Sequence, residues 1–243
     1  MNEIMIKNIN RINKAERYIT MLKELFLQAI TKFLFGVLLV GILIFVPAGT
    51  VSFFNGWLFM GSLFIPMFLV GVVLLMKNPK LLERRLEAKE KQGEQSLVVK
   101  LSGLMFLVGF IIAGLNVRFD WYRLPNFVSI IATFVFLMTY LLYAEVLREN
   151  TYLSRTIQVC ENQKVIDTGL YAIVRHPMYS VTLLLFLAIP LILGSLYSFF
   201  IFLAYPFIIA KRIKSEEELL EHELEGYREY KKKVKYRLIP FLW

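Results

Sequence analysis

Two long stretches without a charged side chain dominate this sequence. Residues 33–76 and residues 177–210 contain no Asp, Glu, Lys or Arg over 44 and 34 positions, respectively. A helix that crosses about 30 Å of hydrocarbon needs roughly 20 residues, so each stretch is too long for a single crossing. We therefore predict that each stretch folds as a helical hairpin within a membrane.

The composition agrees with a membrane location for most of the chain. Of the 243 residues, 57% are hydrophobic, and the mean hydropathy is strongly positive, unlike that of a soluble domain. Residues 101–117 and 127–144 form two further apolar segments of spanning length. The sequence thus predicts an all-α integral membrane protein with about four full transmembrane helices, a C-terminal hydrophobic helical hairpin and a cytoplasmic C-terminal helix.

Turn-forming residues indicate where the two hairpins divide. Asn55-Gly56 is the expected division of the first uncharged stretch, and Pro190 together with Gly194-Ser195 is that of the second. The second division leaves two segments of about 13 and 16 residues, which are short for full crossings. A hairpin that enters the membrane only part of the way remains open for residues 177–210.

The positive charges predict the orientation of the chain. All but two of the 28 Lys and Arg residues cluster before residue 33, between residues 77 and 100, between residues 148 and 175, and after residue 210; the exceptions are Arg118 and Arg123. Cytoplasmic loops carry an excess of Lys and Arg, so both termini, the 77–100 connector and the loop before residue 177 are expected on the cytoplasmic side. The net charge of +9 then favours an anionic membrane surface as partner and disfavours nucleic acid.

The N-terminal residues 1–32 are polar and charged, with no short apolar core that would mark a cleavable signal peptide. Apolar residues recur at helical spacing among Lys and Arg, which predicts a cytoplasmic amphipathic helix at the membrane interface; they are Ile12, Ala15, Ile19, Leu22 and Phe26. In the charged connector 77–100, Pro79 is placed to begin a helix and Gly93 to interrupt it.

Few residues could serve metal chemistry or ion transport. Cys160 is the only cysteine and there are two histidines, so a cysteine metal cluster, a disulfide framework and a site of several histidines are excluded. Acids are absent from the predicted spans apart from Glu145 at the end of the fourth, and Glu145 can pair with Arg148 one turn later. This scarcity of intramembrane carboxylates disfavours a proton-coupled transporter.

The first informative motif is Gly169–Tyr179, which reads GLYAIVRHPMY. It places two tyrosines, Arg175, His176 and Pro177 directly before the second apolar stretch. A purely structural interpretation remains open: Arg175 would reach the lipid headgroups, His176 would cap a helix and Pro177 would occupy its first turn.

The second informative segment, residues 211–234, carries seven of the 19 acidic residues. At about 100° per residue, one helical face collects Ile213, Leu220, Leu224, Tyr227 and Val234, whereas Glu218, Glu225 and Glu229 lie opposite. Glu216 and Glu217 fall inside the apolar face and therefore need partners. Arg212, one turn before Glu216, can provide one, either as a structural pair or as part of a site.

Together, these two segments resemble the signature of the isoprenylcysteine carboxyl methyltransferase family and of the related phospholipid N-methyltransferases. The family pattern Gly-x-Tyr-x-x-x-Arg-His-Pro-x-Tyr is followed by a hydrophobic hairpin, by Arg-x-x-x-Glu-Glu-x-x-Leu and by a Gly-x-x-Tyr ending. Its counterparts here are Gly169, Tyr171, Arg175, His176, Pro177, Tyr179, Arg212, Glu216, Glu217, Leu220, Gly226, Tyr227 and Tyr230. The resemblance covers roughly residues 152–243.

The resemblance implies an enzyme that uses S-adenosyl-L-methionine without a Rossmann fold, and the sequence indeed lacks a glycine-rich dinucleotide motif. Residues 148–243 would then form the methyltransferase region behind the membrane helices of residues 33–147. The residues that the resemblance assigns to the cofactor are Gln158, Gln163, Lys164, Val165, Ile166, Tyr171, His176, Pro177, Met178, Tyr179 and Glu216. The positions from Gln158 to Ile166 match the family poorly in residue type.

The resemblance also implies that Arg212 is the catalytic residue that binds the substrate. A guanidinium suits a carboxylate acceptor on a lipophilic or lipid-modified substrate. The alternative is the amine of a phospholipid headgroup, for which a nearby cation is unfavourable and His176 would have to serve as base. A non-catalytic membrane scaffold or a transporter remains a further alternative.

Overall fold

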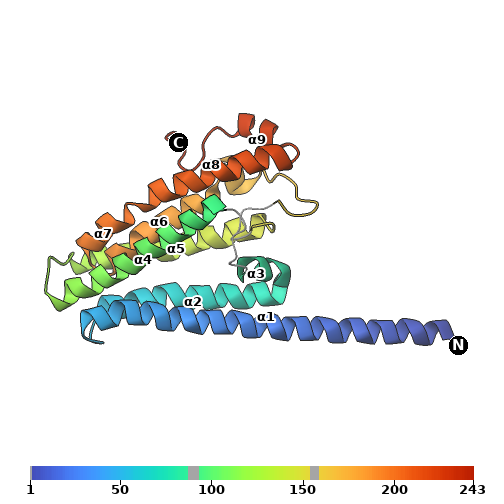
Figure 1. The fold of residues 1–243 in the computed structure, drawn as a ribbon, viewed down its shortest axis with the longest axis horizontal. Helices are drawn as coiled ribbons and strands as arrows, with labels where there is room; N and C mark the ends of the chain where they lie inside the picture. Colours follow the sequence, from blue (N-terminus) through green and yellow to red (C-terminus); the bar gives the residue numbers. More distant parts are fainter. Residues whose placement is uncertain (1, 87–92, 154–158) are drawn as a thin grey trace.

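The computed structural model describes residues 2–86, 93–153 and 159–243. Its long helices are α1 (Asn2–Ala48), α2 (Phe54–Lys77), α4 (Gly93–Arg118), α5 (Asn126–Glu149), α6 (Pro177–Ile192) and α8 (Tyr205–Glu223). The short ones are α3 (Pro79–Leu86), the 3-10 helix η1 (Gly169–Ala172), α7 (Leu196–Phe202) and α9 (Tyr227–Lys233). The long helices lie side by side in a bundle, and α3, α9 and the loop before η1 gather toward one end (Figure 1). The all-α fold is confirmed.

Five segments of the described chain are long and apolar enough to cross a membrane, so the protein is a multi-pass integral membrane protein. They are Ile19–Ala48, Phe54–Lys77, Ser96–Arg118, Asn126–Glu149 and Leu196–Glu223. The last of these differs from the prediction, because α7 and α8 together give 28 residues of sufficient hydropathy where a short half-hairpin was expected. Only α6, with 16 residues, remains shorter than a full crossing.

The outer surface of the bundle is apolar, as lipid contact requires. Phe35 and Leu38 on α1 and Phe134 and Leu141 on α5 each expose more than half of their side chains. Such a belt of large apolar groups is unfavourable in water and favourable in hydrocarbon. The exposed faces of these helices therefore indicate which sides meet the lipid.

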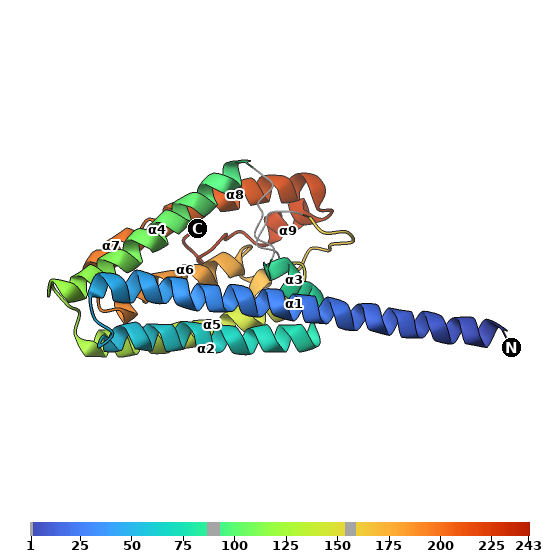
Figure 2. The same ribbon diagram turned by 60° about the horizontal axis from the view of Figure 1, so that its bottom comes forward.

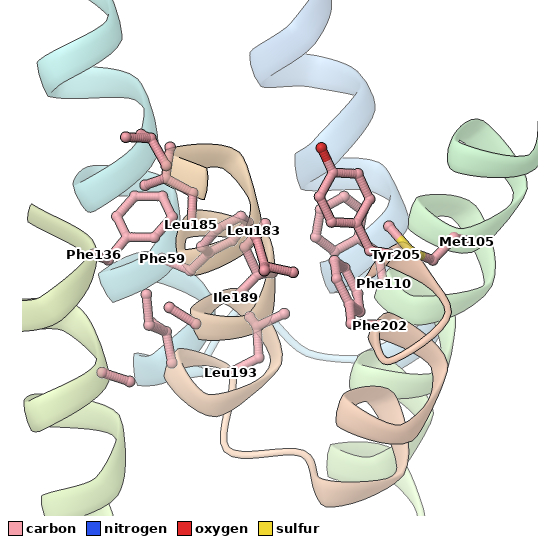
Figure 3. Close-up of a cluster of buried hydrophobic side chains, with 14 of the residues drawn as sticks. Phe59, Met105, Phe110, Phe136, Leu183, Leu185, Ile189, Leu193, Phe202 and Tyr205 are labelled. Atoms are coloured by element: carbon pink, nitrogen blue, oxygen red, sulfur yellow. The ribbon is translucent and has the colours of Figure 1, made fainter. Parts of the chain in front are cut away.

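Helix α6 lies at the centre of the core (Figure 3). Leu183, Leu185, Ile189 and Leu193 project from α6 or its end, and all four are buried. On one side they meet Phe59 of α2 and Phe136 of α5, and on the other side lie Phe110 of α4 and Phe202 of α7. The predicted apolar hairpin is thus the hub around which the other helices pack.

Of the two predicted hairpin divisions, the first is wrong and the second is correct in part. The first was placed too late, because α1 already ends at Ala48 and α2 has begun by Asn55. The side chain of Asn55 donates instead to Ser129 Oγ at 3.0 Å, which joins α2 to α5. The second was correct at Gly194-Ser195, where Ser195 caps α7, but Pro190 lies inside α6.

The N-terminal segment is not a separate surface helix, since α1 runs without interruption through Lys32 into the first span. No Gly or Pro occurs before Gly36 to break it, and its N-terminal half extends beyond the bundle as a straight rod (Figure 2). Side chains of residues 1–15, Ile12 and Ala15 included, lie outside the described part. The division of the chain into regions 1–32, 33–147 and 148–243 stays a prediction.

The other local predictions concern the connector and the end of α5. Helix α3 begins at Pro79, as expected for a helix start. The break predicted at Gly93 stays a prediction, because the residues before it, 87–92, lie outside the described part. The predicted pair of Glu145 and Arg148 is confirmed, with the guanidinium donating to both carboxylate oxygens at 2.7 and 2.8 Å.

Residues 211–234 do not form one continuous helix as the helical-face prediction assumed. Helix α8 ends at Glu223, and Gly226 adopts a φ of +81° before α9 begins. Only glycine reaches this backbone region without strain. The turn folds α9 back, so that Leu224, Tyr227, Tyr230 and Val234 form a small buried cluster of their own.

Candidate active site

A cavity of about 480 Å³ lies where the loops and short helices meet the end of the bundle. Its walls come from the end of α3, the N-terminal half of α4, the segment after α5, the loop before η1, η1 itself, the N-terminal half of α6, and from α8 and α9. This volume falls within the range of about 300 to 1,000 Å³ that is typical of small-molecule sites.

The cavity brings together most of the residues that the sequence pointed to. Those that line it are Gln163, Lys164, Val165, Ile166, Tyr171, His176, Met178, Tyr179, Arg212 and Glu216. Pro177 is buried in the first turn of α6 and does not face the cavity. Gln158 lies outside the described residues.

The loop before η1 is held against the rest of the site by specific contacts. Gln163 Oε1 accepts a hydrogen bond from the backbone N–H of Cys160 at 2.9 Å. Val165 packs against the small cluster formed by the end of α8 and by α9. Lys233 of α9 donates to Asp167 at 2.7 Å, and this ammonium lowers the pKa of the Asp167 carboxyl.

The carboxylate of Glu217 is the centre of a network of hydrogen bonds and ion pairs beside the cavity. It accepts from Arg175 Nε at 2.7 Å and from Arg237 Nε at 3.0 Å, and His176 Nε2 lies 3.2 Å away. The side chains of Glu217 and Arg175 are only 3% and 5% exposed. A buried carboxylate is tolerated only when charge and hydrogen bonds compensate for lost hydration, and here both are present.

Arg175 completes this clamp and does not reach toward lipid headgroups. Its Nη1 donates to the carbonyl oxygens of Val234 and Lys235, each at 2.7 Å. Its backbone N–H donates to the carbonyl of Tyr236, and the next N–H, that of His176, donates to Arg237. The clamp therefore fixes the start of α6 against the C-terminal segment, and the headgroup interpretation of Arg175 is wrong.

The side chain of Glu216, unlike that of its neighbour Glu217, faces the cavity. Tyr179 links it to Arg212: the Tyr179 hydroxyl donates to Glu216 Oε2 and accepts from Arg212 Nε at 2.9 Å. The predicted neighbours Arg212 and Glu216 thus lie in one polar array with Tyr179 between them, and all three line the cavity. The His176 ring stacks beside Tyr179, with 5.7 Å between ring centroids.

Tyr171 is held by two further elements. Its hydroxyl accepts from Asn150 Nδ2 at 3.0 Å, and its carbonyl accepts from the Tyr230 hydroxyl at 2.7 Å. Burial raises the pKa of both phenols above the ordinary tyrosine value. Both side chains therefore stay neutral, so the wall that they form adds aromatic surface to the cavity and no charge.

Gly169, the first residue of the GLYAIVRHPMY motif, is in close contact with the carboxylate of Glu149. It has a φ of +51°, and a Cβ at this position would lie 1.9 Å from Glu149 Oε2. The Thr168 hydroxyl donates to the other oxygen of Glu149 at 2.7 Å. The motif thus requires glycine both for the backbone conformation and for the space that Glu149 fills.

Replacing Gly169 with alanine is expected to destabilise the protein by about 1 to 2 kcal/mol through the backbone conformation alone, with an added loss because Glu149 must move. Thermal unfolding in detergent measures the effect. Gly71→Ala in α2 is the matched control, because open space surrounds this glycine and alanine favours a helix. Equal melting temperatures for the two variants would contradict the assignment.

Several residues of the cavity were not singled out from the sequence. They are Arg85, Val98, Phe106, Asn150, Tyr152, Thr182, Phe186, Tyr205 and Ile209 among others, whereas Tyr227 and Tyr230, which also line the cavity, had been named. Tyr227 and Tyr230 had been assigned to an apolar stripe or to the family ending. The remainder carried no local signal, since single aromatic or polar residues at helix ends are common in membrane proteins.

Comparison with known proteins agrees with this geometry. Residues 129–222 match the model of the isoprenylcysteine carboxyl methyltransferase (ICMT) family. The match runs from α5 through α8, and it contains Tyr171, the Arg175–Tyr179 segment, Arg212 and both glutamates. No curated protein matches the chain. The protein is thus an integral membrane protein whose residues 129–222 are similar to the isoprenylcysteine carboxyl methyltransferase family.

Proposed function

We propose that the protein transfers a methyl group from S-adenosyl-L-methionine to the carboxylate of a lipophilic, isoprenylcysteine-like acceptor. The observation that carries this proposal is the array of Glu216, Tyr179 and Arg212 on the wall of the cavity. It places an acid, a phenol and a guanidinium beside aromatic and apolar walls within one space.

The residues present fit the cofactor. When bound, it supplies an electrophilic methyl group on a sulfonium ion. Aromatic faces attract such cations, and the cavity offers Tyr171, Tyr179 and Tyr227. Glu216 can accept hydrogen bonds from ribose hydroxyls or from an amino group. The loop residues 163–166 also line the cavity and would help to hold the cofactor.

Arg212 would orient the acceptor. Its guanidinium is fixed by Tyr179, and a planar fork of N–H donors matches a carboxylate. Attack of a carboxylate on a sulfonium removes one charge of each sign, so a cavity shielded from water favours the reaction. No covalent enzyme intermediate is needed, because positioning the two reactants supplies much of the rate.

Apolar residues of the cavity suit a lipophilic substrate. Val98, Val99 and Phe106 contribute from α4, and Phe186 and Ile209 contribute from α6 and α8. Because α4 lies in a candidate membrane span, we propose that an apolar acceptor reaches the site from the lipid.

The alternative is N-methylation of a phospholipid amine, with His176 as base. In this structure His176 Nε2 lies 3.2 Å from Glu217, within a group that also contains Arg175 and Arg237. A ring that is engaged in this clamp is poorly placed to accept a proton from a substrate. The guanidinium of Arg212 also disfavours binding of a protonated amine. Both contacts favour the carboxylate acceptor.

The test is methyl transfer by the purified protein in lipid nanodiscs with isotopically labelled S-adenosyl-L-methionine. We expect label on an S-prenylated N-acetylcysteine and none on phosphatidylethanolamine. Calorimetry with S-adenosylhomocysteine is run in parallel. Label on the amine alone would replace the carboxylate proposal, and no heat at millimolar ligand would favour a non-catalytic scaffold.

We further propose that both termini, the 77–100 connector and the cavity face the cytoplasm. The Lys and Arg residues cluster in these segments, and cytoplasmic segments of membrane proteins carry an excess of such residues. Cys160 is a native reporter, since it is partly exposed in the loop before η1. An impermeant thiol reagent is expected to label it in inverted vesicles and not in intact cells. A Cys160→Ser variant controls for background. Labelling of intact cells would reverse the orientation.

A further inference from the structure

Arg85 reaches the cavity from a part of the chain outside the residues 129–222 that match the family. It lies on α3, which is fixed to the bundle by the buried side chains of Leu81 and Leu82. Its neighbour Arg84 donates to the carbonyl of Thr151 at 2.8 Å. Arg85 is therefore presented to the cavity by a helix that is anchored on two sides.

The contacts of Arg85 are with a neutral group. Its Nη2 donates to the Tyr143 hydroxyl at 2.7 Å, and its guanidinium carbon lies 5.7 Å from the centre of the same ring. The side chain is half-buried. Within the described residues, no carboxylate lies at ion-pair distance from it. A partly desolvated guanidinium is most stable when an anion accepts its hydrogen bonds.

The other arginines of the cavity wall have anionic groups beside them. Arg175 is paired with Glu217, and Arg212 shares Tyr179 with Glu216. Glu216 is the acid that faces the cavity, whereas Lys164 adds one more positive charge to its wall. The charges around the described cavity thus leave an excess of positive charge, and an anion bound near Arg85 would reduce it.

We propose that Arg85 is a second guanidinium, in addition to Arg212, for the carboxylate of the lipophilic acceptor, and that it thereby selects acidic acceptors over neutral ones. This inference rests on the proposed function. A carboxylate in the cavity could also come from the methionine part of the cofactor. Figure 1 places α3 beside α2 and the end of α5, away from α8, which carries Glu216 of the expected cofactor wall. Because α8 also carries Arg212, the two sources are distinguished by experiment: loss of acid binding identifies the acceptor, and loss of S-adenosylhomocysteine binding identifies the cofactor.

Binding of two ligands to the full-length protein in nanodiscs, with S-adenosylhomocysteine present, tests the proposal. The ligands are an S-prenylated N-acetylcysteine and its methyl ester. They differ in the negative charge of the carboxylate that Arg85 would bind. Arg85→Ala is expected to weaken binding of the acid about 10- to 100-fold, the usual range for one charge-assisted hydrogen bond, and to leave the ester unchanged. Arg85→Lys should recover part of the loss, because an ammonium lacks the planar fork.

Lys80→Ala is the matched control, because Lys80 is a cation on the same helix, its side chain is exposed and it does not line the cavity. It should leave both affinities unchanged. Equal weakening of acid and ester by Arg85→Ala would show a structural role and overturn the proposal. Weakened S-adenosylhomocysteine binding with an unchanged preference for the acid would move Arg85 to the cofactor. A wild-type protein that binds neither ligand would instead refute the proposed acceptor class itself.

Discussion

Replacing Glu217 with alanine is expected to lower the free energy of unfolding by about 3 to 5 kcal/mol, the usual loss when one partner of a buried ion pair is removed. The structure shows why the loss should be large. Glu217 accepts from Arg175 and Arg237 and lies beside His176, and the Arg175 side chain is 5% exposed. Without the carboxylate, this guanidinium would stay buried with only backbone carbonyls as partners.

The same clamp joins the start of α6 to the C-terminal segment, so its loss should also loosen the wall of the cavity. Differential scanning calorimetry in detergent, with and without S-adenosylhomocysteine, measures stability and cofactor affinity together. Glu217→Gln should retain part of the stability, because the amide oxygen can still accept one hydrogen bond.

Glu218→Ala provides the control, since this neighbour is exposed on α8 and surface substitutions usually change stability by less than about 0.5 kcal/mol. Arg237→Ala is expected to fall between the two, because the side chain of Arg237 is 26% exposed. If Glu217→Ala unfolded at the same temperature as Glu218→Ala, the clamp would have no part in stability.

Replacing Arg212 with alanine is expected to reduce methyl transfer to a carboxylate acceptor by roughly one to two decades in kcat/KM, which corresponds to the loss of about 1.5 to 3 kcal/mol from one charge-assisted contact. The affinity for S-adenosylhomocysteine should change much less, because Glu216 and the aromatic walls remain. Arg212→Lys should restore only part of the activity, since lysine cannot grip a carboxylate in bidentate fashion.

A Tyr179→Phe variant provides the comparison that separates the role of Arg212 from that of the hydrogen bonds made by Tyr179. Tyr179→Phe keeps the aromatic face and removes the hydroxyl that bonds to both Arg212 and Glu216. It should therefore weaken both cofactor binding and turnover, whereas Arg212→Ala should affect turnover selectively. Melting temperature, cofactor affinity and turnover are measured on each variant. Parallel loss of all three in Arg212→Ala and Glu216→Ala would identify a structural pair, and full activity of Arg212→Ala would exclude an acceptor role.

Local sequence patterns determined the membrane class of this protein and the direction of single side chains. The uncharged stretches predicted hydrophobic helices because spanning length and apolar character are properties of contiguous residues. Helical periodicity placed Glu216 and Glu217 on the inner face of α8 and Glu218 on the outer face, and the structure confirms this sorting. The GLYAIVRHPMY motif marked the start of the central helix α6.

Tertiary structure alone decided which partner each inward carboxylate received. Glu216 and Glu217 are adjacent, yet about 100° of helical rotation directs them to different neighbours. Glu216 accepts from Tyr179 in the cavity. Glu217 accepts from Arg175, which precedes it in the sequence, and from Arg237, which follows it. The return of the chain at Gly226 and the approach of Arg85 from α3 likewise depend on how distant elements pack. Periodicity along one helix carries no information about contacts with residues so far away in the sequence, because those contacts form only when the helices assemble.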